Sequence, residues 1–136
     1  MKYLVDANVL SEPTKPAPQR SVFQWLRDHE LELVVNPIVL GELEHGILLL
    51  PVGKRRARLQ QWFQQGLATF RVLDLDAKVA STWAQLLAGL RKRGLAMPVK
   101  DSLIAATALA HGLTVVTRNV IDFRATGVAV VNPFEN

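Results

Sequence analysis

Short, mostly apolar runs alternate with longer segments of helical periodicity along the chain, and this alternation is the strongest constraint on the fold. Five runs have the length and composition of β-strands: residues 2–5, 31–35, 70–75, 113–116 and 128–131. Strands separated by helices favour a parallel sheet, and continuous apolar strands are typical where helices cover both faces. We therefore expect an α/β fold, a three-layer α/β/α domain with a central, mainly parallel sheet of about five strands.

The segments between these runs carry apolar residues at helical spacing. We expect helices over residues 22–29, 37–50, 54–65, 77–93 and 98–111. Asn36 followed by Pro37 is a favourable helix start. Asp76 is expected to cap the fourth helix, while Gly94 and Gly112 are expected to end the last two. The segment SLIAATALA in the last helix is apolar nearly all round, so we expect it to be deeply buried.

The chain is long enough for one domain with a hydrophobic core, and we expect a single domain over residues 1–136. The absence of cysteine excludes disulfides and thiolate metal sites, and it fits a reducing cytoplasm. The sequence contains neither a signal-peptide hydrophobic stretch nor an apolar run of membrane-spanning length. We therefore expect a cytoplasmic protein without membrane contact.

The chain is basic, with a net charge of +4 and a sequence pI of about 9.9. Its Lys and Arg residues cluster at 54–58 and again at 91–93. A polyanionic partner is one interpretation of these clusters, and solvated helix faces are the other. Charge alone does not decide between the two.

Four acidic residues occupy positions where the local pattern does not require a charge: Asp6, Glu42, Asp101 and Asp122. Asp6 ends the first expected strand and Asp122 follows the fourth. Glu42 lies at the edge of the apolar face of its helix, whereas Glu44 points away from that face. Asp101 lies in the first turn of its helix. In an open parallel sheet, such positions converge on the crevice at the carboxyl ends of the strands.

A carboxylate cluster is costly, because two like charges about 4 Å apart repel by roughly 4 kcal/mol at an effective dielectric near 20. A divalent cation relieves this repulsion, and oxygen ligands suit Mg²⁺ or Mn²⁺. Such ions activate water and stabilise the leaving oxygen in phosphodiester hydrolysis, so that no side-chain nucleophile is needed. Taken singly, each acid also has a structural interpretation as a helix cap or a surface residue.

Four segments closely resemble the PIN-domain family: YLVDANVLSE, LGELEHGI, MPVKDSLIAATALAHGLTVVTRNVIDF and GVAVVNPF. The resemblance covers essentially the whole chain and is nearest to the VapC-type and FitB-like toxins of type II toxin–antitoxin systems. It implies an α/β/α domain and an endoribonuclease that depends on Mg²⁺ or Mn²⁺. It also implies a homodimer and a cognate VapB/FitA-like antitoxin, which binds operator DNA and blocks the active site with its tail.

The resemblance assigns roles to the four acids. Asp6 matches the first acid of the family and Asp101 the principal third acid, and these two are the expected direct metal ligands. Glu42 matches the second acid. Asp122 matches the fourth, although Asn119 is a competing candidate for part of that role.

Other positions have supporting roles or depart from the family pattern. Thr117 and Asn119 resemble polar residues that orient water or the acids, while Arg118 and Lys100 are candidate contacts to substrate phosphate. Ala7 stands where Thr or Ser commonly follows the first acid, which removes one supporting hydrogen bond. Lys100 stands where a small or apolar residue is usual, so a cation there either neutralises part of the acidic cluster or binds phosphate.

Two other functions remain open. In the first, the chain is a weakly catalytic or non-catalytic partner of a DNA-binding antitoxin in an operon-regulating complex, an interpretation that Ala7 leaves available. In the second, Asp6 is a covalent nucleophile in phosphotransfer, but Asn8 occupies the position where such enzymes commonly carry a second aspartate. The three histidines lack paired metal-binding spacing, so we expect structural or surface roles for them. The three tryptophans lie on apolar helix faces, so we expect them to pack in the core or at a dimer interface.

Overall fold

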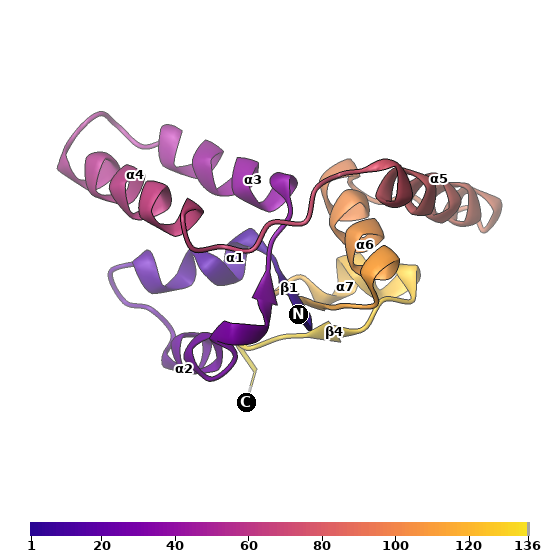
Figure 1. The fold of residues 1–136 in the computed structure, drawn as a ribbon, viewed down its shortest axis with the longest axis horizontal. Helices are drawn as coiled ribbons and strands as arrows, with labels where there is room; N and C mark the ends of the chain where they lie inside the picture. The colour runs from indigo at the N-terminus through magenta and orange to yellow at the C-terminus, as the bar shows by residue number, and fades with distance from the viewer. Residues whose placement is uncertain (136) are drawn as a thin grey trace.

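The structure is a computed structural model that describes residues 1–135. A four-stranded parallel sheet with the order β2-β1-β3-β4 lies at its centre (Figure 1). The strands are β1 (Tyr3–Val5), β2 (Leu33–Val34), β3 (Thr114–Val116) and β4 (Val130–Val131). Helices flank this sheet, as expected for a three-layer α/β/α domain.

The expected helices are confirmed with small shifts at their ends. They are α2 (Arg20–Asp28), α3 (Pro37–Leu48), α4 (Lys54–Leu67), α5 (Ala77–Lys92) and α6 (Val99–His111). There are two further helices, α1 (Ala7–Leu10) and α7 (Val120–Phe123). Helix α1 begins just after the end of β1, and α7 begins after the short turn that follows β3. With four residues each, they are too short for a periodic apolar face, so the sequence pattern does not reveal them.

The expected strand over residues 70–75 is wrong, and the sheet has four strands where about five were expected. This segment forms only an isolated parallel bridge between Val72 and Val35. Two hydrogen bonds hold it: the Val35 amide donates to the Arg71 carbonyl at 3.0 Å, and the Leu73 amide donates to the Val35 carbonyl at 2.8 Å. Most of its side chains are exposed, so no burial rewards a longer ladder at this edge.

The strand order reverses direction between β1 and β3. The chain passes from β1 to β2 on one side, and it later returns to β3 on the other side of β1. In open parallel sheets, the crevice at such a reversal is the usual place for a site. Asp6 at the end of β1 and Thr117 at the end of β3 both lie there, and the Asp6 amide donates to the Val116 carbonyl at 2.9 Å.

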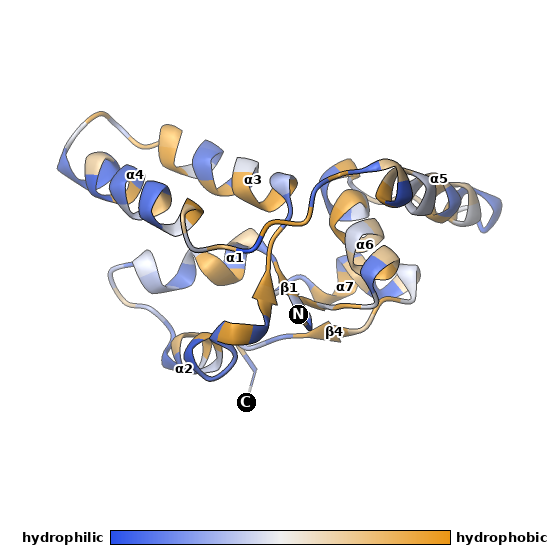
Figure 2. Ribbon diagram, viewed as in Figure 1, coloured by the Kyte–Doolittle hydropathy of each residue, from blue (hydrophilic) through white to orange (hydrophobic). Residues whose placement is uncertain are grey.

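Burial of the central strands fixes their register. Leu4, Val5, Val115 and Val116 have no exposed surface. Figure 2 shows predominantly hydrophobic strands, whereas α4 and α5 alternate hydrophobic and hydrophilic residues along their length. The apolar segment of α6 is buried as expected, at Ser102 and from Ile104 to Ala108. Within residues 1–135, none of the helices has the length and apolarity needed to cross a membrane.

A buried asparagine joins the two helices that carry acidic candidates. The side chain of Asn36 caps α3 by accepting a hydrogen bond from the Val39 amide at 3.0 Å, and it donates to the Thr107 hydroxyl in α6 at 3.0 Å. Asn36 and Thr107 are both fully buried. Because Glu42 lies in α3 and Asp101 in α6, this contact helps to set the separation of the two acids.

We predict that Asn36→Ala lowers the free energy of unfolding by about 1–3 kcal/mol, because it removes a helix cap and leaves a buried hydroxyl without its donor. Urea unfolding of the two proteins measures the difference. Gln64→Ala on the exposed surface of α4 is the matched control and should change stability by less than about 0.5 kcal/mol. An Asn36→Ala variant as stable as the control would contradict the role of this contact.

Candidate active site

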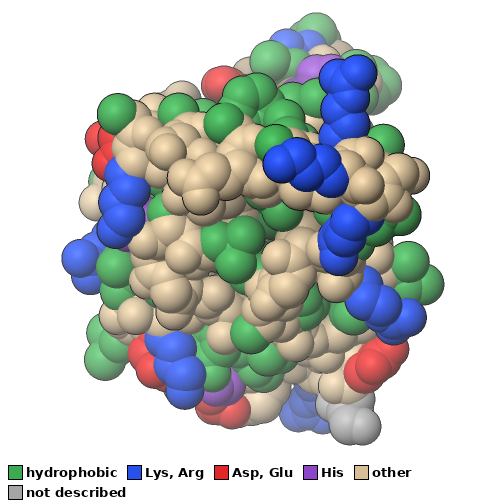
Figure 3. Space-filling model, turned by 90° about the vertical axis from the view of Figure 1, so that its right-hand side faces the viewer, with side chains coloured by type: hydrophobic (Ala, Val, Ile, Leu, Met, Phe, Trp, Pro, Cys, Tyr) green, Lys and Arg blue, Asp and Glu red, His purple; other side chains and the backbone are tan. Residues whose placement is uncertain are grey.

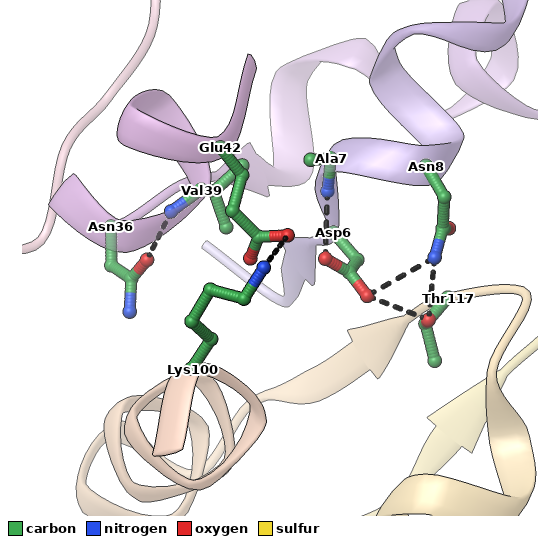
Figure 4. Close-up of polar contacts among 8 residues, drawn as sticks. All are labelled: Asp6, Ala7, Asn8, Asn36, Val39, Glu42, Lys100 and Thr117. Carbon is green, nitrogen blue, oxygen red and sulfur yellow. Dashed lines mark hydrogen bonds and ion pairs between the residues drawn. The ribbon is translucent and has the colours of Figure 1, made fainter. Parts of the chain in front are cut away.

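The carboxylate of Asp6 is buried at the strand reversal, with 3% of the residue exposed. One oxygen accepts a hydrogen bond from the Ala7 amide at 2.8 Å. The other accepts from the Thr117 hydroxyl at 2.8 Å and from the Asn8 side chain at 3.3 Å (Figure 4). Burial raises the pKa of the Asp6 carboxyl above its usual value, and these donors oppose the rise without cancelling it. Asp6 is thus a fixed, desolvated carboxylate.

A network of polar groups fixes the ends of β1 and β3 around Asp6. The Asn8 amide donates to the Thr117 hydroxyl oxygen at 3.3 Å, and its carbonyl oxygen accepts from the Arg118 amide at 3.1 Å. The Asn119 amide also donates to the Thr117 hydroxyl, at 3.0 Å. Thr117 therefore orients Asp6 as expected. Asn119 contributes through its backbone, while its side chain is exposed.

Asn8 is a supporting residue that sequence reasoning missed. Its signal was its place in the helix that begins directly after the strand carrying Asp6. A polar side chain there reaches the neighbouring strand end once β1 and β3 are known to be adjacent. Without the strand order, nothing distinguished Asn8 from a solvent-exposed residue.

Glu42 lies half-buried on α3, whereas Glu44 is exposed, as the helical spacing predicts. One oxygen of Glu42 lies 3.6 Å from the Lys100 amine, and the other is buried without a hydrogen-bond partner within residues 1–135. Burial and the negative charge of Asp6 raise the pKa of the Glu42 carboxyl, while Lys100 lowers it. A buried carboxylate oxygen without a partner is costly, so this atom is suited to an additional ligand.

Asp101 is the most perturbed acid of the site. Burial and the charges of Asp6, Asp122 and Glu42 raise its pKa to about 6, and Lys100 opposes the rise. Three carboxylates therefore act electrostatically on the fourth, which shows that the fold brings all four acids into one region. Asp122, in the first turn of α7, is exposed, so it borders this region from the solvent side.

The four acids share a region without forming a closed ligand cage. Within residues 1–135, no three acidic or histidine side chains are grouped closely enough to hold an ion by themselves. Mg²⁺ suits such an open arrangement, because it retains several waters and binds through few carboxylates together with substrate oxygens. The unpartnered oxygen of Glu42 and the mutual repulsion at Asp101 also fit a divalent cation. Asp6, Glu42 and Asp101 are the residues that would hold it.

Glu12 shows how a structural buried acid differs from these three. It is as buried as Asp6, but one of its carboxylate oxygens accepts from the Gln19 amide at 2.9 Å. The other lies 3.0 Å from the Lys15 amine. Glu12 thereby holds the start of α2, and its second oxygen, which accepts no hydrogen bond within residues 1–135, has the ammonium group of Lys15 beside it. Burial of an acid is therefore not sufficient to mark the site; neighbouring carboxylates, which act on Glu42 and Asp101 but not on Glu12, are the additional sign.

Arg118 lies beside the site, but its guanidinium group packs on an aromatic ring. Its central carbon is 4.7 Å from the centre of the Phe134 ring. The residue is exposed and lines an open cavity of about 560 Å³ together with Asn119, Asp122 and Arg124. A contact between Arg118 and substrate phosphate remains a prediction, and this position leaves one face of the guanidinium accessible.

The histidines and tryptophans have the surroundings expected of structural residues. The ring of His29 stacks on Trp25 with a centre-to-centre distance of 4.1 Å. Trp83 donates a hydrogen bond to the Ser102 hydroxyl at 2.9 Å. Trp62 packs against the hydrophobic core and also lines the groove described next.

A groove of about 280 Å³ runs from the acids along α1, α3 and α4. Ala7, Asn8 and Glu42 border its acidic end. Its floor is apolar, with Ile47 and Trp62, and the basic residues Lys15 and Arg55 lie along it. On the opposite part of the molecule, Figure 3 shows the face that carries α5, where Lys and Arg side chains are scattered along the edges. The groove adjoins the acids through Glu42.

Comparisons with known proteins agree with this fold and site. Residues 3–128 match the PIN domain model. The chain is 42% identical to "Plasmid stability protein StbB" of Pseudomonas syringae pv. tomato over 97% of this chain and 98% of that protein. It is 37% identical to "VapC ribonuclease Y4jK" of Sinorhizobium fredii, over 97% of both chains, and 38% identical to "Toxin FitB" of Neisseria gonorrhoeae, over 98% and 99%.

Solved structures of similar proteins have the same fold. The crystal structure of FitAcB from Neisseria gonorrhoeae superposes with a TM-score of 0.92 at 38% identity, covering 98% of this chain and 99% of that chain. A structure of FitAB bound to an IR36 DNA fragment has a TM-score of 0.91 at 37% identity, covering 98% and 96%. The chain belongs to the PIN-domain family, in the branch of VapC-type and FitB-like toxins.

We predict that Asp101 makes the metal-free protein less stable as pH rises. Its carboxyl has a higher pKa folded than unfolded, so the folded state binds more protons between about pH 4 and pH 6, and stability falls across that window. Because the group is partly exposed, solvent screening reduces the effect to about 1–2 kcal/mol. Urea unfolding in EDTA from pH 4 to pH 7 should therefore show Asp101→Asn gaining stability relative to the unmodified protein.

The control for this experiment is Asp74→Asn, which changes an exposed acid outside the site. Its stability difference from the unmodified protein should stay constant across the pH range. A constant difference for Asp101→Asn as well would show that Asp101 is not desolvated among like charges.

Proposed function

We propose that this protein is a metal-dependent endoribonuclease, the toxin component of a type II toxin–antitoxin system. The observation that carries this proposal is the group of desolvated carboxylates at the strand reversal, where Asp6, Glu42 and Asp122 all raise the pKa of Asp101. The named activity of relatives such as the VapC ribonuclease Y4jK supports it. Mg²⁺ or Mn²⁺ is the proposed cofactor, since all the ligand atoms are oxygens.

In this proposal the chain's own residues have distinct tasks. Asp6 and Asp101 are the principal metal ligands and Glu42 the third, while Asp122 acts from the exposed side of the site with Asn119 beside it. A bound divalent cation supplies Lewis acidity for phosphodiester hydrolysis. Thr117 and Asn8 hold the Asp6 carboxylate in one orientation through the hydrogen bonds at 2.8 and 3.3 Å. No side chain is required as a nucleophile.

RNA is the proposed substrate, and basic residues next to the acids are its proposed phosphate contacts. Lys100 and Arg118 lie at the site itself, whereas Lys15 and Arg55 lie along the adjoining groove. These cations offset the repulsion between substrate phosphates and the four carboxylates. A cytoplasmic location fits this substrate and the cysteine-free composition.

We predict that Asp6→Asn and Asp101→Asn each lower the rate of RNA cleavage by at least about 100-fold, since each removes a negative charge from the metal site. Cleavage of an RNA pool in Mn²⁺, read by sequencing of the ends, measures this rate and maps the cut sites. The same assay includes Glu42→Gln, and Glu44→Gln is its matched control. Both substitutions change a glutamate of α3, but only Glu42 faces the site. Normal cleavage by both aspartate variants would refute the assignment.

The weakly catalytic alternative rested on Ala7, which lacks the hydroxyl common at that position. Here the Ala7 backbone amide, the Thr117 hydroxyl and the Asn8 side chain donate to both oxygens of Asp6. The acid therefore has three donors without a hydroxyl at position 7. This arrangement favours an active nuclease over a purely regulatory partner.

We further propose that a VapB/FitA-like antitoxin docks in the groove between α1, α3 and α4. The FitAB structure is bound to an IR36 DNA fragment, and we propose a contact with operator DNA through the antitoxin for this chain as well. The apolar floor and the basic residues Lys15 and Arg55 suit an amphipathic segment with acidic residues. We also expect the toxin to form a homodimer, as the family resemblance implies.

We predict that Gly46→Leu abolishes antitoxin binding without unfolding the protein. Gly46 lines the groove, and a Cβ there would meet no atom within 4 Å, so a larger side chain fills the groove without disturbing the fold. Gly89→Leu on α5 is the matched control, because its Cβ also meets no atom but lies outside the groove. Co-purification with the antitoxin encoded beside the toxin measures binding; retained binding by Gly46→Leu would move the docking surface elsewhere.

A further inference from the structure

A lysine reaches into the carboxylate site from its rim. Lys100, in the first turn of α6, places its amine 3.6 Å from a carboxylate oxygen of Glu42 in α3 (Figure 4). The Lys100 side chain is 64% exposed, whereas that of Glu42 is 24% exposed. The contact therefore joins a mostly exposed cation to a mostly buried carboxylate side chain.

The charge of Lys100 acts on more than its direct partner. It lowers the pKa of Asp6, of Glu42 and of Asp101, in each case against the effect of burial. A single positive charge thus serves three acids that the proposed function assigns to the metal. A divalent cation bound there would also stabilise the charged form of these three carboxylates, and in the metal-free protein the Lys100 side chain has this effect.

The ion pair between Lys100 and Glu42 is also easily replaced by a contact between Glu42 and another cation. An ion pair with one exposed partner at a distance as long as 3.6 Å contributes little to stability, because solvent screens the exposed charge and a long side chain loses rotamer freedom when it is held. The other oxygen of Glu42 has no hydrogen-bond partner within residues 1–135, so the carboxylate is only half satisfied by the lysine. A divalent ion that contacts Glu42 would replace a weak partner and would lie close to the ammonium group, which it repels.

We propose that Lys100 is an internal counter-ion of the metal-free site, and that it competes with the divalent cation for Glu42. The inference rests on the proposed metal-dependent function, and it adds a residue that limits the affinity for the metal. By thermodynamic linkage, a metal ion that displaces Lys100 binds more weakly than it would to the same acids without the lysine. Lys100 is in this sense a positioning residue, which acts through Glu42.

The test is the binding of Mn²⁺ to the whole protein without RNA, measured by titration calorimetry at pH 7. Lys100→Met keeps the length of the side chain and removes the charge, so Mn²⁺ should bind about tenfold more tightly. Lys100→Arg keeps the charge and should stay within about threefold of the unmodified protein. Lys78→Met, at an exposed position of α5, is the matched control and should leave the affinity unchanged.

A thermal scan separates this role from a merely structural one. Without metal, Lys100→Met should melt at or below the temperature of the unmodified protein, since the acids then repel each other without a counter-ion. With Mn²⁺ at a fixed concentration, its melting temperature should rise further than that of the unmodified protein, because tighter binding stabilises the folded state more. A lysine with a purely structural role would lower both melting temperatures equally.

The outcomes distinguish this inference from the proposed function. Equal or weaker Mn²⁺ binding by Lys100→Met, in a protein whose Mn²⁺ binding is lost in Asp101→Asn, would overturn the inference and leave the nuclease proposal standing. An absence of Mn²⁺ binding in every variant would overturn both. Tighter binding by Lys100→Met but not by Lys100→Arg is the result that we expect.

Discussion

The burial of one carboxylate organises this molecule. Asp6 lies where the strand order reverses, and a charge there is tolerated only because Ala7, Asn8 and Thr117 donate to its oxygens. Those donors come from the ends of two neighbouring strands, so the same hydrogen bonds that satisfy the acid also hold the chain at the sheet edge. Stability and site geometry therefore depend on one set of contacts. A fold that keeps these contacts keeps a desolvated oxygen ligand in place.

Other acids are brought to Asp6 by helix packing. The hydrogen bond from Asn36 to Thr107 couples α3 to α6, and through them Glu42 to Asp101. Packing thereby places acids near one another, and burial together with the neighbouring carboxylates raises the pKa of Asp101. The repulsion is what gives the site its affinity for positive charge, whether from a metal ion or from a lysine. In the proposed metal-bound state, a Lys100 amine displaced from Glu42 would be available to a substrate phosphate.

Much of this was predictable from the sequence, because the relevant signals are local. The apolar runs, together with the helix start at Asn36–Pro37 and the helix end at Gly112, predict helices and strands whose central residues agree with the structure. The positions of Asp6 and Thr117 at strand ends follow from these predicted elements. The prediction of a strand at residues 70–75 is wrong because the composition of this segment suits a strand, while its position at the sheet edge leaves it mostly exposed. Asn8 and the structural role of Glu12 could not be predicted, since both depend on partners that are distant in sequence or fixed by a turn.

The position of the groove links recognition to catalysis. Its acidic end is bordered by Ala7, Asn8 and Glu42, so an occupant of the groove lies against the proposed metal site. A partner segment with a basic residue at that end would meet the unpartnered oxygen of Glu42 and take the place of the counter-ion. Such a partner inhibits by two effects at once, because it fills the path of the substrate and neutralises the carboxylates that would hold the metal. Inhibition would then require no change of fold. It would require only that a partner segment bind the apolar floor of the groove and place a positive charge beside Glu42.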